Sequence, residues 1–175
     1  MKECEPIKHK TDGACAPLTI RRARREDYQA VYTLEKLEFD MHRQARPDYF
    51  KAQAEGYSQE EFEQLLAQPC PIAWLAVCEE KIIGLCFGRI AASAENSFCR
   101  SRKVAFIEDL VTLPEWRGQG VATALLKRAR GQALAEGAQA LELCVWSFNQ
   151  SAMRLYERLG MRVQYYRMEE SLENG

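Results

Sequence analysis

The spacing of apolar residues in the first third of the chain predicts one strand followed by two helices. Residues 18–23 alternate between apolar and polar side chains, which is typical of a half-buried strand. Residues 25–42 have helical spacing, and Pro47 is expected to end that helix because proline disfavours helical geometry at the residue before it. A second helix is predicted over 58–68, where Ser58 and the glutamate three residues later form a capping-box pattern. The apolar stripe of the first helix consists of Tyr28, Val31, Leu34 and Leu37.

The remaining two thirds of the chain alternate strands with helices. Residues 72–92 are predicted to form a hairpin of two strands that turns at Glu79-Glu80, and residues 101–113 a third strand. A helix is predicted over 121–136. The resulting order is β-α-α-β-β-β-α-β-α-β, which predicts a mixed α/β fold. The last three predicted elements are a strand over 140–148, a helix over 149–160 and a strand over 161–169.

Composition narrows the class of protein. The chain has 175 residues, of which 47% are hydrophobic and 28% charged, as in an ordinary globular domain. We expect a single domain over 18–170 behind a flexible tail over 1–17. A net charge of −1 argues against nucleic acid or a membrane as the main partner. No apolar run is long enough to span a membrane or to serve as a signal-peptide core, so a cytoplasmic protein is expected.

The cysteines and histidines predict no metal site. The seven cysteines contain no C-x-x-C pair, and the chain has two histidines. Several of the cysteines lie inside apolar runs, which is typical of reduced thiols packed as small hydrophobic side chains. Cys144 is interpreted in the same way, since no histidine is near it in the sequence to make it a nucleophile.

Two glycines stand at the entrance of the helix predicted after the third middle strand. In the stretch LPEWRGQGVATALL, Gly118 and Gly120 leave the backbone bare where consecutive N–H groups and the helix dipole favour an anion such as a pyrophosphate. A P-loop would need a lysine that is absent here, and a dinucleotide fingerprint would need glycine in place of Thr123. An ordinary tight turn is the structural alternative.

The pattern Arg117-x-x-Gly120-x-Ala122 resembles the acyl-CoA-binding motif of the GNAT superfamily of N-acetyltransferases. The resemblance covers roughly residues 18–168, and residues 106–120 look like the same stretch of spermidine/spermine-type diamine N-acetyltransferases. It implies a twisted, mainly antiparallel sheet with helices on both faces, splayed between the fourth and fifth strands where acetyl-CoA enters. It also implies that acetyl-CoA, the cosubstrate, contacts Leu110, Val111, Thr112, Arg117, Gly118, Gln119, Gly120, Val121, Ala122, Thr123 and Asn149.

The same resemblance implies two catalytic residues. Glu108 corresponds to a glutamate that serves the acceptor amine as general base. Tyr156, seven residues after Asn149, corresponds to a tyrosine beside the sulfur that protonates the leaving thiolate. Each residue also has a structural interpretation, because Tyr156 falls on an apolar helical stripe and Glu108 is close in sequence to Arg102 and Lys103 as salt-bridge partners.

A second carboxylate adjoins the proposed base. Since neighbouring residues of a regular strand point to opposite faces, Glu108 and Asp109 are not expected to share one cleft. Asp109 and Glu142 are the next candidates for the base.

The acceptor site is expected along the connection between the first two helices. His42, Arg46 and Tyr49, together with Asp48, are the candidates for binding the acceptor, although a surface loop with a satisfied histidine explains them as well. The predicted function is transfer of acetyl from acetyl-CoA to a primary amine of a small molecule, polyamine-like or amino-acid-like, by direct attack in a ternary complex. The alternatives are a protein N-terminal or lysine acetyltransferase and a non-catalytic acetyl-CoA-binding regulatory module. Dimers are frequent in the family, so the resemblance also leaves a homodimer open.

Overall fold

The computed structural model describes residues 17–53, 56–93, 95 and 97–172. The chain divides into two compact units, residues 1–144 and residues 145–175, which are taken separately below. The predicted flexible tail lies almost wholly outside the described residues, and the single domain over 18–170 stays a prediction.

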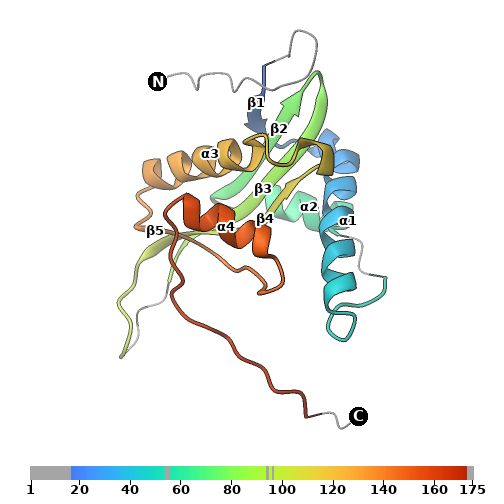
Figure 1. Ribbon diagram of the computed structural model, residues 1–175. Coiled ribbons are helices and arrows are strands. Elements are labelled where there is room, and N and C mark those ends of the chain that lie inside the picture. Colours follow the sequence, from blue (N-terminus) through green and yellow to red (C-terminus); the bar gives the residue numbers. More distant parts are fainter. Residues whose placement is uncertain (1–16, 54–55, 94, 96, 173–175) are drawn as a thin grey trace. The chain divides into compact units, whose positions relative to one another are not determined.

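The first unit contains a five-stranded sheet in the order β1-β2-β3-β4-β5 (Figure 1). The first three pairings are antiparallel, and β4 pairs with β5 in parallel. This arrangement confirms the predicted mixed fold with a mainly antiparallel sheet. The strands are β1 (Thr19–Arg22), β2 (Pro71–Cys78), β3 (Lys81–Ala92), β4 (Lys103–Thr112) and β5 (Ala140–Leu143).

The hairpin between β2 and β3 turns where the sequence predicts it. Glu79 and Glu80 have φ angles of 47° and 67°, and two successive left-handed residues match the twist of a two-residue hairpin. The predicted strand over 140–148 is shorter than expected, because β5 ends at Leu143. The length of β5 determines how many residues of β4 are paired on the side away from β3.

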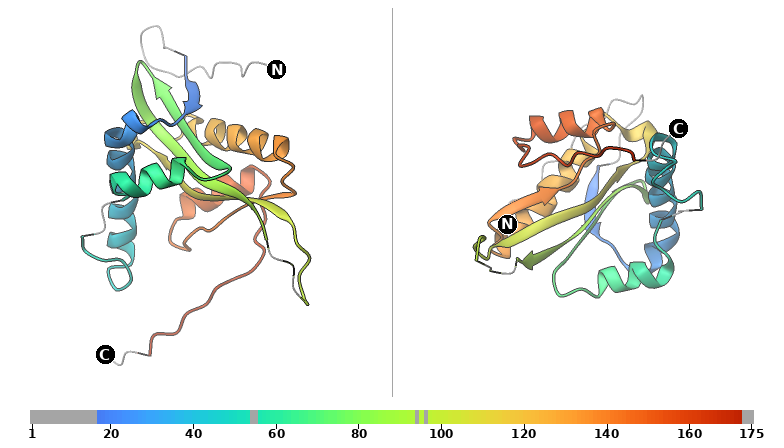
Figure 2. Two further views of the ribbon diagram at one scale, coloured as in Figure 1. Left: turned by 180° about the vertical axis from the view of Figure 1, so that it is seen from behind. Right: turned by 90° about the horizontal axis from the view of Figure 1, so that it is seen from below.

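Helices cover both faces of the sheet, as predicted (Figures 1 and 2). The helix α3 (Val121–Ala135) packs on one face, while α1 (Tyr28–Ala45) and α2 (Gln59–Leu66) pack on the other. The helix α1 ends at Ala45, in agreement with the predicted effect of Pro47. The Ser58 capping box of α2 is also confirmed.

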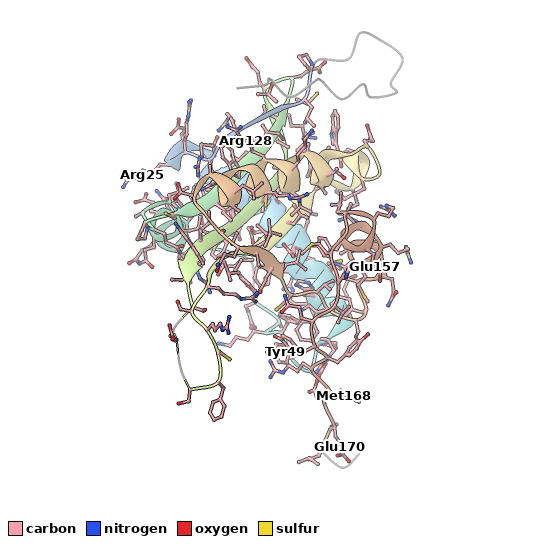
Figure 3. All side chains as sticks on the ribbon, turned by 90° about the vertical axis from the view of Figure 1, so that its left-hand side faces the viewer. Arg25, Tyr49, Arg128, Glu157, Met168 and Glu170 are labelled. Atoms are coloured by element: carbon pink, nitrogen blue, oxygen red, sulfur yellow. The ribbon has the colours of Figure 1, made fainter. Side chains whose placement is uncertain are left out.

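The core on the side of α1 and α2 is built from stacked aromatic and aliphatic side chains. Phe62 of α2 lies against Phe87 of β3 with ring centroids 5.9 Å apart, and both side chains are fully buried. Each side chain of this size that leaves water contributes about 1.5–3 kcal/mol to folding. On the face that α3 covers, the guanidinium carbons of Arg22 and Arg128 lie 4.2 and 4.4 Å from the ring centroid of Trp74 of β2. Arg128 belongs to α3 and is labelled in Figure 3.

A β-bulge interrupts the ladder between β3 and β4. Phe87 is opposite Asp109 and Gly88 is opposite Ile107, so Glu108 has no partner residue on β3. Gly88 is required there, because a Cβ atom at that position would lie 2.1 Å from the carbonyl oxygen of Phe106. The bulge breaks the alternation of faces along β4.

The second unit contains one helix, α4 (Gln150–Arg158), within its described residues. The predicted last strand over 161–169 is wrong, because residues 161–172 form no strand or helix. Its apolar side chains are exposed, with Tyr166 at 81% and Met168 at 91% of their full accessible surface. Strand propensity reflects a partner strand and a surface to pack on, and the described residues of this unit form no strand with which this segment could pair. None of the described helices is both long enough and apolar enough to cross a membrane.

The start of α1 is fixed to β1 by one buried carboxylate. Both guanidinium Nη atoms of Arg21 donate to the Asp27 carboxylate at 2.7 Å, and the backbone N–H of Arg24 donates to it at 2.8 Å. Burial opposes ionisation of Asp27, but these hydrogen bonds prevail and hold its pKa below the ordinary value. The ionised form therefore stabilises the fold.

We expect Asp27→Asn to lower the free energy of unfolding by about 2–3 kcal/mol at pH 7, because it leaves the Arg21 fork without its charged acceptor. Since the folded pKa is depressed, this contribution is present above the unfolded pKa, near 4, and is lost as the pH falls through the folded value. Denaturant unfolding at pH 7 and at pH 3 measures the difference, which should narrow at the lower pH. A difference independent of pH would contradict this role of the charge.

Candidate functional site

The glycine turn opens α3 without any protein group to cap it. Gly118 and Gly120 have φ angles of 74° and 86°, in the left-handed region that glycine adopts without strain. Gly120 is the N-cap residue of α3, no side chain makes a cap hydrogen bond there, and the first turn carries no acidic residue. The first N–H groups of any α-helix lack partners within the helix. In α3 they are therefore available to an external anion.

Two side chains hold the turn from behind. The Nε atom of Arg117 donates to the carbonyl oxygen of Thr112 at 3.3 Å, and Gln119 Nε2 donates to the carbonyl oxygen of Glu115 at 2.8 Å. Above Gly118 the turn is open, because a Cβ atom placed there would have no described atom within 4 Å. The side chains of Arg117 and Gln119 thus stiffen the turn, while the position of Gly118 stays open.

The strand β4 has an unpaired edge next to this turn. Its pairing with β5 runs from Val104 opposite Ala140 to Ile107 opposite Leu143, and β4 continues alone on that side to Thr112. The predicted cosubstrate residues Leu110, Val111 and Thr112 all lie in this continuation. Thr112 Oγ1 is buried without a hydrogen-bond partner among the described residues. The pairing of β4 with β5 stops where β5 ends, which agrees with the predicted opening of the sheet between these two strands.

Glu108 lies at the bulge and forms an ion pair with Arg89 of β3. The partners proposed from the sequence are engaged elsewhere, since Arg102 pairs with Glu142 and Lys103 with Glu136. The side chain of Glu108 is 26% exposed and so reaches solvent.

A cluster of three more deeply buried carboxylates lies between α1 and β4, and the sequence analysis did not predict it. Glu35 and Glu38 of α1 and Asp109 of β4 each place a carboxylate oxygen within 4.8 Å of the others. The hydroxyl of Tyr57, from the connection before α2, donates to Asp109 Oδ2 at 2.7 Å. Glu108 instead pairs with Arg89, so the two neighbouring carboxylates make different contacts, as the sequence predicts.

The environment of this acidic cluster opposes negative charge. Glu35 is fully buried, and burial together with the nearby Asp109 and Glu38 raises its pKa to about 10. Burial and Asp109 raise the pKa of Glu38 to about 8. Burial also raises the pKa of Asp109, against the hydrogen bond from Tyr57. At neutral pH the cluster needs protons or a cation to balance its charge.

The residues predicted to bind the acceptor contact one another and their neighbours at the C-terminal end of α1. The ring of His42 stacks on Phe50 with centroids 5.2 Å apart, and its burial lowers its pKa. Arg46 binds the Asp48 carboxylate at 2.6 Å and lies over the ring of Tyr49. Tyr49 is 56% exposed (Figure 3). These contacts fit a stable surface loop, and a role in binding remains a prediction.

The second unit carries the remaining predicted residues. Asn149 is the N-cap of α4, and its Oδ1 accepts a hydrogen bond from the backbone N–H of Ala152 at 3.1 Å. Tyr156 lies on α4 and is half-buried. Cys144, the last residue of the first unit, is exposed just beyond β5 rather than packed within a strand.

Comparisons with known proteins place these features in a family. The sequence model described as "Acetyltransferase (GNAT) family" matches residues 28–161. Thialysine N-epsilon-acetyltransferase of Bos taurus is 40% identical over 55 residues, which cover 31% of this chain and 32% of that protein, so the match spans about a third of the relative. Aminoalkylphosphonate N-acetyltransferase of Salmonella typhimurium is 28% identical over 155 residues, or 87% of this chain and 90% of that protein.

Solved structures with a similar fold agree with this family match. A mutant of the BH1408 protein from Bacillus halodurans aligns with a TM-score of 0.85 and 27% identity over 89% of this chain and 99% of that one. The aminoglycoside N-acetyltransferase AAC(6')-Iy in complex with CoA aligns with a TM-score of 0.66 and 20% identity over 91% and 99% of the two chains, which shows a shared fold. The open glycine turn and the edge of β4 that β5 leaves unpaired agree with these matches. The chain belongs to the acetyltransferase (GNAT) family.

Proposed function

We propose that the protein transfers the acetyl group of acetyl-CoA to a primary amine of a small molecule, polyamine-like or amino-acid-like, by direct attack in a ternary complex. The observation that carries the proposal is the uncapped start of α3 beside the unpaired edge of β4 in a member of this family. The named relatives that act on thialysine and on aminoalkylphosphonates support a small acceptor.

The residues of the turn and of β4 fit acetyl-CoA. The N–H groups of Gly118 to Thr123 would bind the pyrophosphate, and the free main chain of Leu110 to Thr112 would pair with the amide groups of the pantetheine arm. The orphan hydroxyl of Thr112 gives this edge one more group that needs a partner. Acetyl-CoA supplies the acetyl group as an activated thioester. Asn149 is also proposed to contact acetyl-CoA.

Two residues are proposed to move protons. Glu108 takes the proton of the acceptor ammonium, and Tyr156 gives one to the leaving thiolate. Asp109 is the alternative base, because it lies beside Glu108 at the bulge. His42, Arg46 and Tyr49 are proposed to border the acceptor. A cytoplasmic location and a homodimer also remain proposals.

The first prediction concerns the phosphate cradle. Ala122→Asp places a carboxylate in the first turn of α3, where it should leave the melting temperature unchanged or raise it, since acidic residues favour a helix N-terminus by about 0.3–1 kcal/mol. The same charge should weaken acetyl-CoA binding by about tenfold or more. Calorimetric titration gives the affinity, and Ala122→Asn is the neutral control of equal size. Equal affinities of the two variants would sink the assignment of the turn.

The second prediction concerns the acid. Acetylation of a panel of small amines should identify an acceptor, and with that acceptor Tyr156→Phe should lower turnover about 10–1000-fold while keeping acetyl-CoA affinity. Tyr165→Phe removes the same hydroxyl from an exposed tyrosine of the same unit and serves as control. If no amine is acetylated but acetyl-CoA binds, the protein is a non-catalytic binding module. Equal turnover of both variants and the wild type would remove Tyr156 from the mechanism.

The third prediction separates a base from an ion pair. Glu108→Gln and Arg89→Gln break the same salt bridge, which is largely exposed and contributes about 0–1 kcal/mol to stability. If Glu108 is the base, Glu108→Gln alone should lower kcat/KM about 100-fold or more, since proton-transfer groups contribute about that much. If Glu108 is structural, both variants should show the same small loss of melting temperature and wild-type kinetics, and Asp109 becomes the candidate.

A further inference from the structure

The acidic cluster of Glu35, Glu38, Asp109 and Tyr57 lacks a compensating charge. None of its three carboxylates forms an ion pair with the residues that the structure describes. Both oxygens of Glu35 and Oε2 of Glu38 are buried without any hydrogen-bond partner, although buried polar atoms almost always have one. Glu35 is fully buried and points into the cluster. An ordinary packing role would not leave so many acceptors unsatisfied.

The spacing and the chemistry of the donors fit one hard cation. Oxygen ligands lie about 2.0–2.6 Å from Mg²⁺ or Ca²⁺, so ligands of one ion are separated by up to about twice that distance. The carboxylate oxygens of the cluster lie within 4.8 Å of one another. The Tyr57 hydroxyl donates a hydrogen bond to Asp109 and so orients this carboxylate without being a ligand itself. Carboxylates with no sulfur or imidazole favour magnesium, manganese or calcium over zinc or copper.

The connection before α2 covers the base of the Glu35 side chain. A Cβ atom on Gly56 would lie 2.5 Å from Cβ of Glu35, so the connection before α2 is packed directly on this side chain. Glu38 and Asp109 are half-buried, so the cluster is less enclosed at these two residues than at Glu35.

We propose that Glu35, Glu38 and Asp109 bind one divalent cation of the magnesium, manganese and calcium class between α1 and β4. The site departs from the sequence prediction of no metal, which considered thiol and imidazole donors. The bound ion would cross-link α1 and the sheet in the free protein, before any substrate binds. The bound ion would balance the charge beside Glu108 at the bulge.

The proposal is tested on the full chain with Mn²⁺, Mg²⁺ and Ca²⁺ after treatment with a chelator. At least one ion should bind with one-to-one stoichiometry in calorimetry and raise the melting temperature by about 5–10 °C at a hundredfold excess over its Kd. Glu35→Gln should abolish this rise. In chelator the same variant should melt at or above the wild-type temperature, because it removes one of three repelling charges.

Two variants serve as controls. Glu38→Gln tests the same ligand set at a less buried position, in case Glu35→Gln does not fold. Glu60→Gln makes the identical change on the exposed face of α2 and should keep the full rise. Absence of binding by all three ions, or a rise that survives in both Glu35→Gln and Glu38→Gln, would overturn the site. A rise given by 1,4-diaminobutane but by no divalent ion would assign the cluster to an organic ammonium and would overturn it too.

Discussion

The arrangement of the first unit depends on β4, which has a full-length partner on one side and half a partner on the other. Its ladder with β3 continues to Thr112, whereas its ladder with β5 stops at Ile107. Backbone N–H and C=O groups that leave a ladder need other partners. The glycine turn follows at the end of this same edge, so the free main chain and the free helix terminus are adjacent by the order of the sequence alone.

Local chemistry explains why most elements were predictable. Caps, the hairpin and the effect of Pro47 act over a few residues, and the structure has each of them where the sequence places it. The prediction of the last strand was wrong because β-branched and aromatic residues favour a strand without indicating whether a partner strand is present. The β-bulge was also out of reach, since it arises from a register shift opposite Gly88 on another strand.

In the candidate site, too, the local feature was predictable and the feature formed by distant segments was not. The turn over 113–120 was predicted because its glycines and its position before a helix are contiguous in sequence. The acidic cluster was missed because the stripe assigned to α1, at 28, 31, 34 and 37, was drawn only through apolar residues. The buried positions of this helix are Val31, Leu34 and Glu35. A helical face at 31, 34, 35 and 38 contains two glutamates, and that i, i+3, i+4, i+7 pattern was the available signal.

The bare N-terminus of α3 has a consequence for the purified protein. With glycine as its N-cap, this helix forgoes roughly a few tenths of a kcal/mol relative to a serine or aspartate cap, and a small anion that reaches the exposed N–H groups stabilises the helix further. Sulfate and phosphate are such anions. The anion of the buffer should therefore alter the measured stability of this protein and should compete with the proposed cosubstrate, acetyl-CoA. Affinities measured in different buffers are comparable only at the same concentration of the same anion.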